Sequence, residues 1–121
     1  MNAAMHRPPV YALLVDLVGW TLDRTASLPK SHRFTFGERL DRLTLDCLEL
    51  VIEAIYATPD KKAAPLRRVN LNLEKLRVFW RLICDRRWIS RQQLLFVSQR
   101  LDEIGRMVGG WLKQVERKNQ P

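Results

Sequence analysis

The sequence contains few of the residues that build reactive centres. Its 121 residues include two histidines, His6 and His32, and two cysteines, Cys47 and Cys84. Neither histidine lies next to a plausible nucleophile, and Cys84 has no base near it along the chain. A cysteine within a helical pattern usually acts as a small apolar side chain rather than as a nucleophile. We therefore expect a protein that is not an enzyme and has no catalytic residue.

Motifs for metals and cofactors are missing as well. Helical bundles hold metals through inward-facing Glu-x-x-His pairs, and the chain contains none. Glycine-rich phosphate loops follow a strand, whereas Gly109 and Gly110 lie inside a helical pattern. The sequence thus predicts no metal site and no cofactor.

Long apolar runs are also absent. A membrane-spanning helix needs about 20 consecutive apolar residues, and the longest candidate, residues 10–22, is interrupted by Asp16. Residues 1–9 lack the apolar core and cleavage site of a signal peptide. These two absences predict a cytoplasmic protein with reduced thiols and no membrane partner.

Acidic residues are few relative to basic ones. The chain has 13 acidic and 21 basic residues, a formal net charge of +8, and most of the cations are arginines. The planar guanidinium group suits phosphates and carboxylates. Net charge gives information about binding partners and not about the fold. Because the net charge is positive, we expect a polyanionic partner.

Four segments have the apolar spacing of amphipathic helices, at about residues 9–28, 36–57, 66–87 and 91–117. Thr35 with Glu38, and Ser90 with Gln93, have the spacing of a capping box and predict the starts of the second and fourth helices. Helices of this length joined by short loops form an up-down-up-down antiparallel four-helix bundle. We therefore predict an all-α protein with a single domain over residues 1–121.

Each predicted helix has one apolar stripe for the core. Gly105 and Gly109 interrupt the last helix, and we expect a close backbone approach there. The predicted core residues are Val10, Tyr11, Leu14, Leu17, Val18 and Leu22 in the first helix; Leu40, Leu43, Cys47, Leu50, Val51 and Ala54 in the second; Val69, Leu73, Leu76, Trp80 and Ile83 in the third; and Leu94, Val97, Leu101, Ile104, Val108, Trp111 and Val115 in the fourth.

The second and third helices each carry an additional apolar row. A single bundle needs one buried stripe per helix, and extra apolar surface usually marks an interface. The second helix is acidic and the third is basic, which favours a head-to-tail contact between copies that closes into a ring. We predict a homo-oligomer with Leu45, Leu48, Ile52, Leu71, Val78 and Leu82 at its interface.

The charge is concentrated in the third helix. Residues 66–87 contain seven cations against Glu74 and Asp85, a net +5 of the chain's +8. Pairing within the helix leaves most of these cations free, so we expect them to bind a polyanion without reading its sequence. Trp88 lies among Arg86, Arg87 and Arg91 and is the tryptophan best placed for a surface role.

Three stretches resemble a known family. They are LEKLRVFWRLI at residues 73–83, EIGRMVGGWLKQVERKNQ at residues 103–120, and the loop SLPKSHRF at residues 27–34. They resemble the accessory variability determinant (Avd) proteins of diversity-generating retroelements, and the likeness extends over all four helices. These proteins are similar in turn to the four-helix-bundle proteins encoded in intervening sequences of bacterial ribosomal RNA genes.

The resemblance implies a bacterial or phage protein that forms a ring-like homopentamer with a basic surface. It also implies binding to the reverse transcriptase of the same retroelement and to RNA and DNA, in support of mutagenic cDNA synthesis and retrohoming. The accessory protein itself carries out no chemistry.

The family's basic residues on the third helix match Arg77 and Arg81, which lead the candidates for contacts with polymerase or nucleic acid. The further candidates are Arg117, Lys118, Arg68, Arg86 and Arg87. Two alternatives stay open. One is a ribosomal-RNA-associated bundle without a polymerase partner, and the other is a structural scaffold oligomer whose charge serves solubility.

Overall fold

Four long α-helices make up the structure. The computed structural model describes residues 7–121, so His6 lies outside the described residues. The helices are α1 (Pro9–Ala26), α2 (Glu38–Tyr56), α3 (Ala63–Asp85) and α4 (Arg91–Lys118). Residues 7–121 contain no β-strand, and the all-α prediction is confirmed.

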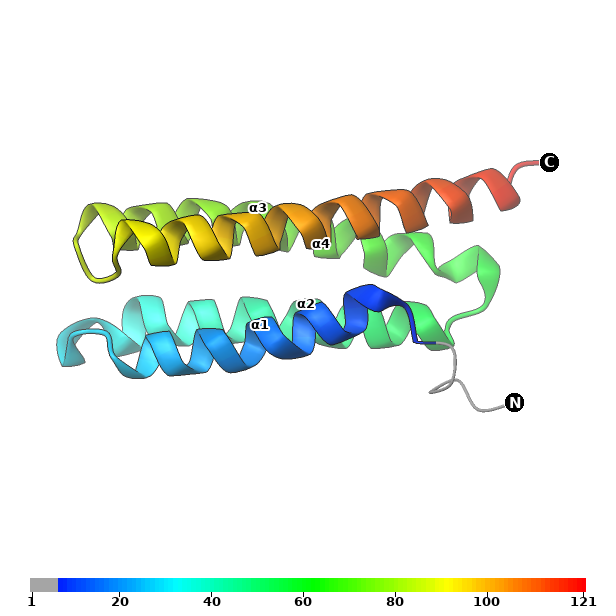
Figure 1. Cartoon of the computed structure of the whole chain (residues 1–121). Coiled ribbons are helices and arrows are strands. Elements are labelled where there is room, and N and C mark those ends of the chain that lie inside the picture. The colour runs from blue at the N-terminus through cyan, green and yellow to red at the C-terminus, as the bar shows by residue number, and fades with distance from the viewer. Residues whose placement is uncertain (1–6) are drawn as a thin grey trace.

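The helices pack as a bundle in which successive helices run in opposite directions (Figure 1). Each helix packs against two neighbours, because α1 and α3 both contact α2 and α4. One end of the bundle holds the α1–α2 and α3–α4 connections, and the other holds the α2–α3 connection and the C-terminus (Figure 1). No helix of the described chain is long and apolar enough to cross a bilayer.

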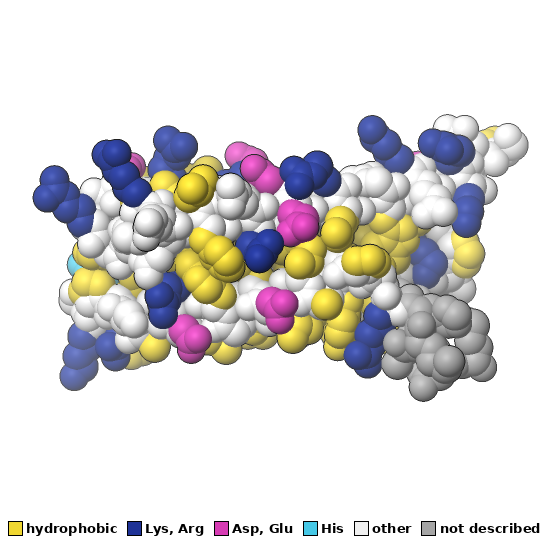
Figure 2. Space-filling view, in the orientation of Figure 1, with side chains coloured by type: hydrophobic (Ala, Val, Ile, Leu, Met, Phe, Trp, Pro, Cys, Tyr) yellow, Lys and Arg dark blue, Asp and Glu magenta, His cyan; other side chains and the backbone are white. Residues whose placement is uncertain are grey.

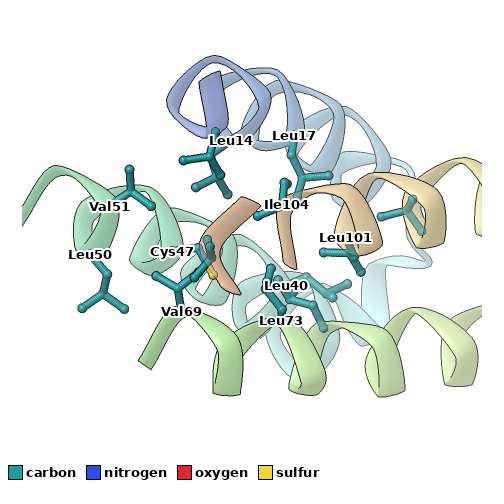
Figure 3. Close-up of a cluster of buried hydrophobic side chains, with 14 of the residues drawn as sticks. Leu14, Leu17, Leu40, Cys47, Leu50, Val51, Val69, Leu73, Leu101 and Ile104 are labelled. Atoms are coloured by element: carbon teal, nitrogen blue, oxygen red, sulfur yellow. The ribbon is translucent and has the colours of Figure 1, made fainter. Parts of the chain in front are cut away.

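The core fills the space between the four helices. The complete predicted stripe of α3 is buried, with Val69, Leu73, Leu76 and Ile83 at 0% exposure and Trp80 at 1%. Side chains from the other three helices point toward it (Figure 3). Fully burying one such side chain stabilises the fold by about 1.5–3 kcal/mol, so these stripes supply the main driving force for the bundle.

The predicted core face of α1 is wrong at its C-terminal end. Leu22 is 44% exposed, whereas Thr21 and Thr25 are buried. Thr21 follows Leu14 by seven residues, so helical geometry places it on the core face. The hydroxyl of Thr25 donates to Asp41 Oδ1 in α2 at 2.8 Å. Burial raises the pKa of Asp41, and this hydrogen bond opposes the shift.

The two predicted capping boxes have different outcomes. Ser90 Oγ accepts from the Gln93 amide at 3.0 Å, and the Ser90 amide donates to Gln93 Oε1 at 2.8 Å, so this prediction is confirmed. The box at Thr35 is wrong, because α2 begins without a side-chain cap. A π-helical turn, Arg33–Gly37, leads directly into α2, and the Glu38 amide donates to the Arg33 carbonyl. A backbone carbonyl thus accepts the hydrogen bond of the first amide of α2, in place of a side-chain cap.

Helix α3 ends in a Schellman motif. The Trp88 amide donates to the Ile83 carbonyl at 3.1 Å, and the Arg87 amide donates to the Cys84 carbonyl at 2.8 Å. The turn requires a left-handed residue after the helix, and Arg87 occupies it with φ of 64°. Glycine usually occupies this position, so Arg87 holds a strained conformation.

Candidate nucleic-acid interface

Both ends of the bundle carry clusters of exposed cations. Figure 2 shows Lys and Arg side chains gathered toward the two ends of one face, with acidic side chains mainly between them. The first cluster, here called the Arg86 end, lies where α1 meets α2 and α3 meets α4. It consists of Lys30, Arg33, Arg86, Arg87 and Arg91, all exposed.

The opposite cluster, here called the Arg117 end, surrounds the connection between α2 and α3. Asn119 Nδ2 at the end of α4 donates to the Pro59 carbonyl in this connection at 2.9 Å, and Arg67 pairs with Glu116. This end of the bundle therefore combines residues near the start of α3 with residues near the end of α4. Its exposed cations are Lys61, Arg67, Arg68, Lys113, Arg117 and Lys118.

The outer side of α3 connects the two ends. Its exposed crest, here called the α3 ridge, carries Arg68, Leu71, Lys75, Val78, Arg81 and Leu82, and exposed Glu74 and Asp85 lie among them. The three apolar members are 58%, 49% and 44% exposed in chain order. From Arg68 to Leu82 the ridge extends for about 20 Å at 1.5 Å per residue. It presents cations and apolar side chains together.

Arg77 does not lie on this ridge. Its Nε is 3.3 Å from Asp102 Oδ1 in α4, its Nη1 is 3.3 Å from Glu74 Oε2, and its Nη2 donates to the Leu101 carbonyl at 3.4 Å. The side chain is one-third exposed. Its contacts with the protein therefore hold α3 and α4 together.

The position of Arg77 also explains one helix-interior glycine. A Cβ on Gly105 would lie 3.1 Å from Arg77 Nη2 and 3.7 Å from Leu73 Cδ1, so the close approach comes from side chains and not from a backbone. A Cβ on Gly109 would meet nothing within 4 Å. The predicted close backbone approach is therefore wrong at both glycines.

The other predicted contact residues are accessible. Arg81 is exposed and has no ion-pair partner within residues 7–121. The same holds for Arg68, Arg86, Arg87, Arg117 and Lys118. The structure does not join them in one patch, because Arg86 and Arg87 lie at one end while Arg68, Arg117 and Lys118 lie at the other.

Trp88 packs between the two connections at the Arg86 end. Its ring stacks on His32 with 4.3 Å between centroids and meets the edge of Phe36 at 5.9 Å. A hollow of about 670 Å³ adjoins it, lined in part by Arg87, Ser90 and Arg91. Trp88 is thus packed against aromatic side chains of the α1–α2 connection and is only partly exposed.

Sequence reasoning missed two members of this end, Lys30 and Arg33. Their loop is basic, which is the one signal the sequence offers. Their proximity to Arg86 and Arg91 depends on the antiparallel packing and could not be found from local patterns.

The predicted oligomer rows are largely exposed. On α2, Leu45 and Ile52 are 41% and 37% exposed, whereas Leu48 is half-buried and packs against the core. Exposed apolar side chains continue onto α1 at Val15 and Leu22. The exposed acidic residues beside them are Asp16, Asp23 and Glu49. The α1–α2 face is therefore apolar and acidic, in contrast to the apolar and basic α3 ridge.

The fold and the charge distribution define a class: an all-helical bundle with cationic ends and an apolar, basic ridge. Residues 12–115 match the bAvd-like family, from α1 to the last turns of α4. The chain belongs to this family, which confirms the resemblance to Avd proteins. Comparisons with curated proteins and with solved structures give no match.

Proposed function

We propose that this protein is the non-catalytic accessory subunit of a diversity-generating retroelement. In this role it binds the element's reverse transcriptase and its RNA or DNA, and it supports mutagenic cDNA synthesis and retrohoming. The observation that carries the proposal is the bAvd-like match over residues 12–115. The exposed cations of the two ends support it, because lysine and arginine neutralise phosphates and release their counterions.

The division of the surface supports a homo-oligomer as part of this function. The α1–α2 face combines apolar side chains with carboxylates, and the α3 ridge combines apolar side chains with cations. Two such faces on different copies are complementary, and a contact between unlike faces closes into a ring at a suitable rotation. The resemblance to Avd proteins favours five copies.

The oligomer has a direct test in light scattering at micromolar concentration. Val78→Glu places a carboxylate on the ridge opposite the acidic α1–α2 face, and we expect it to reduce the mass toward that of a monomer. Leu95→Glu is the matched control, because Leu95 is 59% exposed on α4 and lies outside both faces. A monomeric wild-type protein would refute the assembly.

Polymerase binding is tested by co-purification of the tagged protein with the neighbouring reverse transcriptase, before and after nuclease treatment. We expect a complex that survives nuclease, and we expect Arg81→Ala to weaken it while light scattering shows an unchanged oligomeric mass. Arg39→Ala removes the same charge from an exposed site on α2 and is the matched control. Arg77→Ala is not used as a binding variant. Losing the contacts of Arg77 with α4 should lower the stability of the fold and would confuse the comparison.

Each outcome separates the alternatives. Retained RNA without reverse transcriptase would support the ribosomal-RNA-associated bundle and refute the accessory role. The absence of both partners at low salt would support a structural scaffold. If Arg81→Ala and Arg39→Ala retain the reverse transcriptase equally well, Arg81 is not part of the contact surface. The accessory role would still be supported by the wild-type complex.

A further inference from the structure

Two aromatic side chains lie together on the seam between α1 and α4. The rings of Trp20 and Phe96 have centroids 5.4 Å apart and an interplanar angle of 34°. Trp20 also meets Trp80 edge-on at 5.1 Å, and Trp80 is 1% exposed. The buried ring thus holds Trp20 in place, while Phe96 remains 38% exposed. Figure 2 shows apolar side chains gathered along this seam.

Two arginines flank the ring pair. The guanidinium carbon of Arg100 lies 5.0 Å from the Phe96 centroid, and that of Arg24 lies 6.0 Å from the Trp20 centroid. Nε of Arg24 is buried and has no hydrogen-bond partner among the described residues. Arg100 also pairs with Glu103 at 3.2 Å, which fixes its position beside the ring. The seam therefore carries an Arg–Trp–Phe–Arg series of flat groups.

This series has the composition of a stacking surface for nucleobases. Aromatic side chains bind unpaired bases through their π-faces, and arginine adds cation–π contacts. None of these four residues belongs to the cationic clusters or to the α3 ridge. They are therefore candidates for contacts with bases, and the clusters are candidates for contacts with phosphates.

The seam leads directly from the Arg86 end. Phe96 follows Arg91 by five residues on α4, which is about 7.5 Å along the helix axis. Arg24 lies in the last turn of α1, shortly before the loop that carries Lys30 and Arg33. Exposed Asp16 lies four residues before Trp20, about one helical turn farther from the Arg86 end, and disfavours phosphates there. A strand bound at the Arg86 end can therefore place a base here without continuing down the seam.

We propose that Trp20 and Phe96, flanked by Arg24 and Arg100, form a stacking site for an unpaired base of single-stranded nucleic acid. The phosphates of the same strand contact the cations of the Arg86 end. This inference rests on the nucleic-acid binding in the proposed function and assigns to it a form of ligand, a single strand with exposed bases.

The test uses the full-length protein and a fluorescein-labelled oligo(U) of about 12 nucleotides, a length within the range of single-strand binding sites. Fluorescence anisotropy gives Kd at several salt concentrations. We expect Phe96→Ala to weaken binding about tenfold, the loss of one base stack, with an unchanged salt dependence. Arg86→Ala combined with Arg87→Ala should instead reduce the salt dependence, because phosphate contacts release counterions.

Three controls make the result specific. Leu95→Ala truncates the adjacent, more exposed side chain and should leave Kd unchanged. Phe96→Tyr keeps the ring and should retain the wild-type Kd. An RNA duplex of the same length hides its bases, so Phe96→Ala should leave its binding unaltered.

The outcomes distinguish the two proposals. If Phe96→Ala binds oligo(U) as Leu95→Ala does, the stacking site is overturned while polymerase co-purification still supports the accessory role. If Phe96→Ala loses the reverse transcriptase but keeps oligo(U), the seam is a polymerase contact and the stacking site is overturned. If the wild-type protein binds no oligo(U) at low salt, nucleic-acid binding fails in both proposals.

Discussion

Replacing Arg87 with glycine should stabilise the protein. Arg87 adopts φ of 64° at the end of α3, a conformation that costs an ordinary L-residue roughly 1–2 kcal/mol. Glycine adopts it freely, but its more flexible unfolded chain takes back about 0.5–1 kcal/mol. The hydrogen bonds of the motif use backbone groups and remain in place. We expect a net gain of about 0.5–1 kcal/mol in the free energy of unfolding.

The assay is urea denaturation followed by far-UV circular dichroism at one fixed protein concentration, because association shifts apparent stability. Arg87→Ala is the control, since it removes the same charge but keeps a Cβ at the strained position. The difference between the two variants isolates the backbone contribution. A glycine variant that is no more stable than the alanine variant would refute the strain argument.

Three further predictions concern a cap, the core and the thiols. Ser90→Ala should lower the free energy of unfolding by about 1 kcal/mol, whereas Thr35→Ala should leave it nearly unchanged, and urea denaturation compares them. Trp80→Ala should lower it by about 3–5 kcal/mol because the ring is buried, again measured in urea. In iodoacetamide followed by mass spectrometry, Cys84 should react in the native protein and Cys47 only after unfolding, because burial raises the pKa of the Cys47 thiol to about 12; prompt double labelling would contradict this.

Helical periodicity predicted most of the core, because a stripe that repeats every three or four residues has one possible inner face. It succeeded best in α3, where hydrophobicity and helix phase agree. The prediction failed at Leu22 because burial there follows the position of a residue around the helix and not its hydrophobicity. The buried positions are occupied by Thr21 and Thr25. The hydroxyl of Thr25 satisfies its hydrogen bonding across the α1–α2 contact, which no local pattern reveals.

The candidate interface was less predictable than the fold. The count of cations in α3 identified the charge, but the roles of individual arginines depend on the pairing of helices. Arg77 and Arg81 are one helical turn apart and look alike in sequence, yet Arg77 reaches Asp102 on α4 while Arg81 stays exposed. The ring pair of Trp20 and Phe96 combines residues 76 positions apart in the chain and was likewise beyond sequence reasoning.

The like charge of the two bundle ends has a consequence for how copies can assemble. Cationic tips repel each other over roughly 8–10 Å at moderate ionic strength, so columns built by stacking one copy on the tip of another are disfavoured. The flanks carry mixed charge and apolar side chains, so lateral neighbours meet no such barrier. In the proposed homo-oligomer, lateral assembly would bring the tips together as two positive rims on opposite faces of the particle. A polyanion too long for one rim could then bridge two particles, and stoichiometric excess of RNA should disperse such bridged clusters.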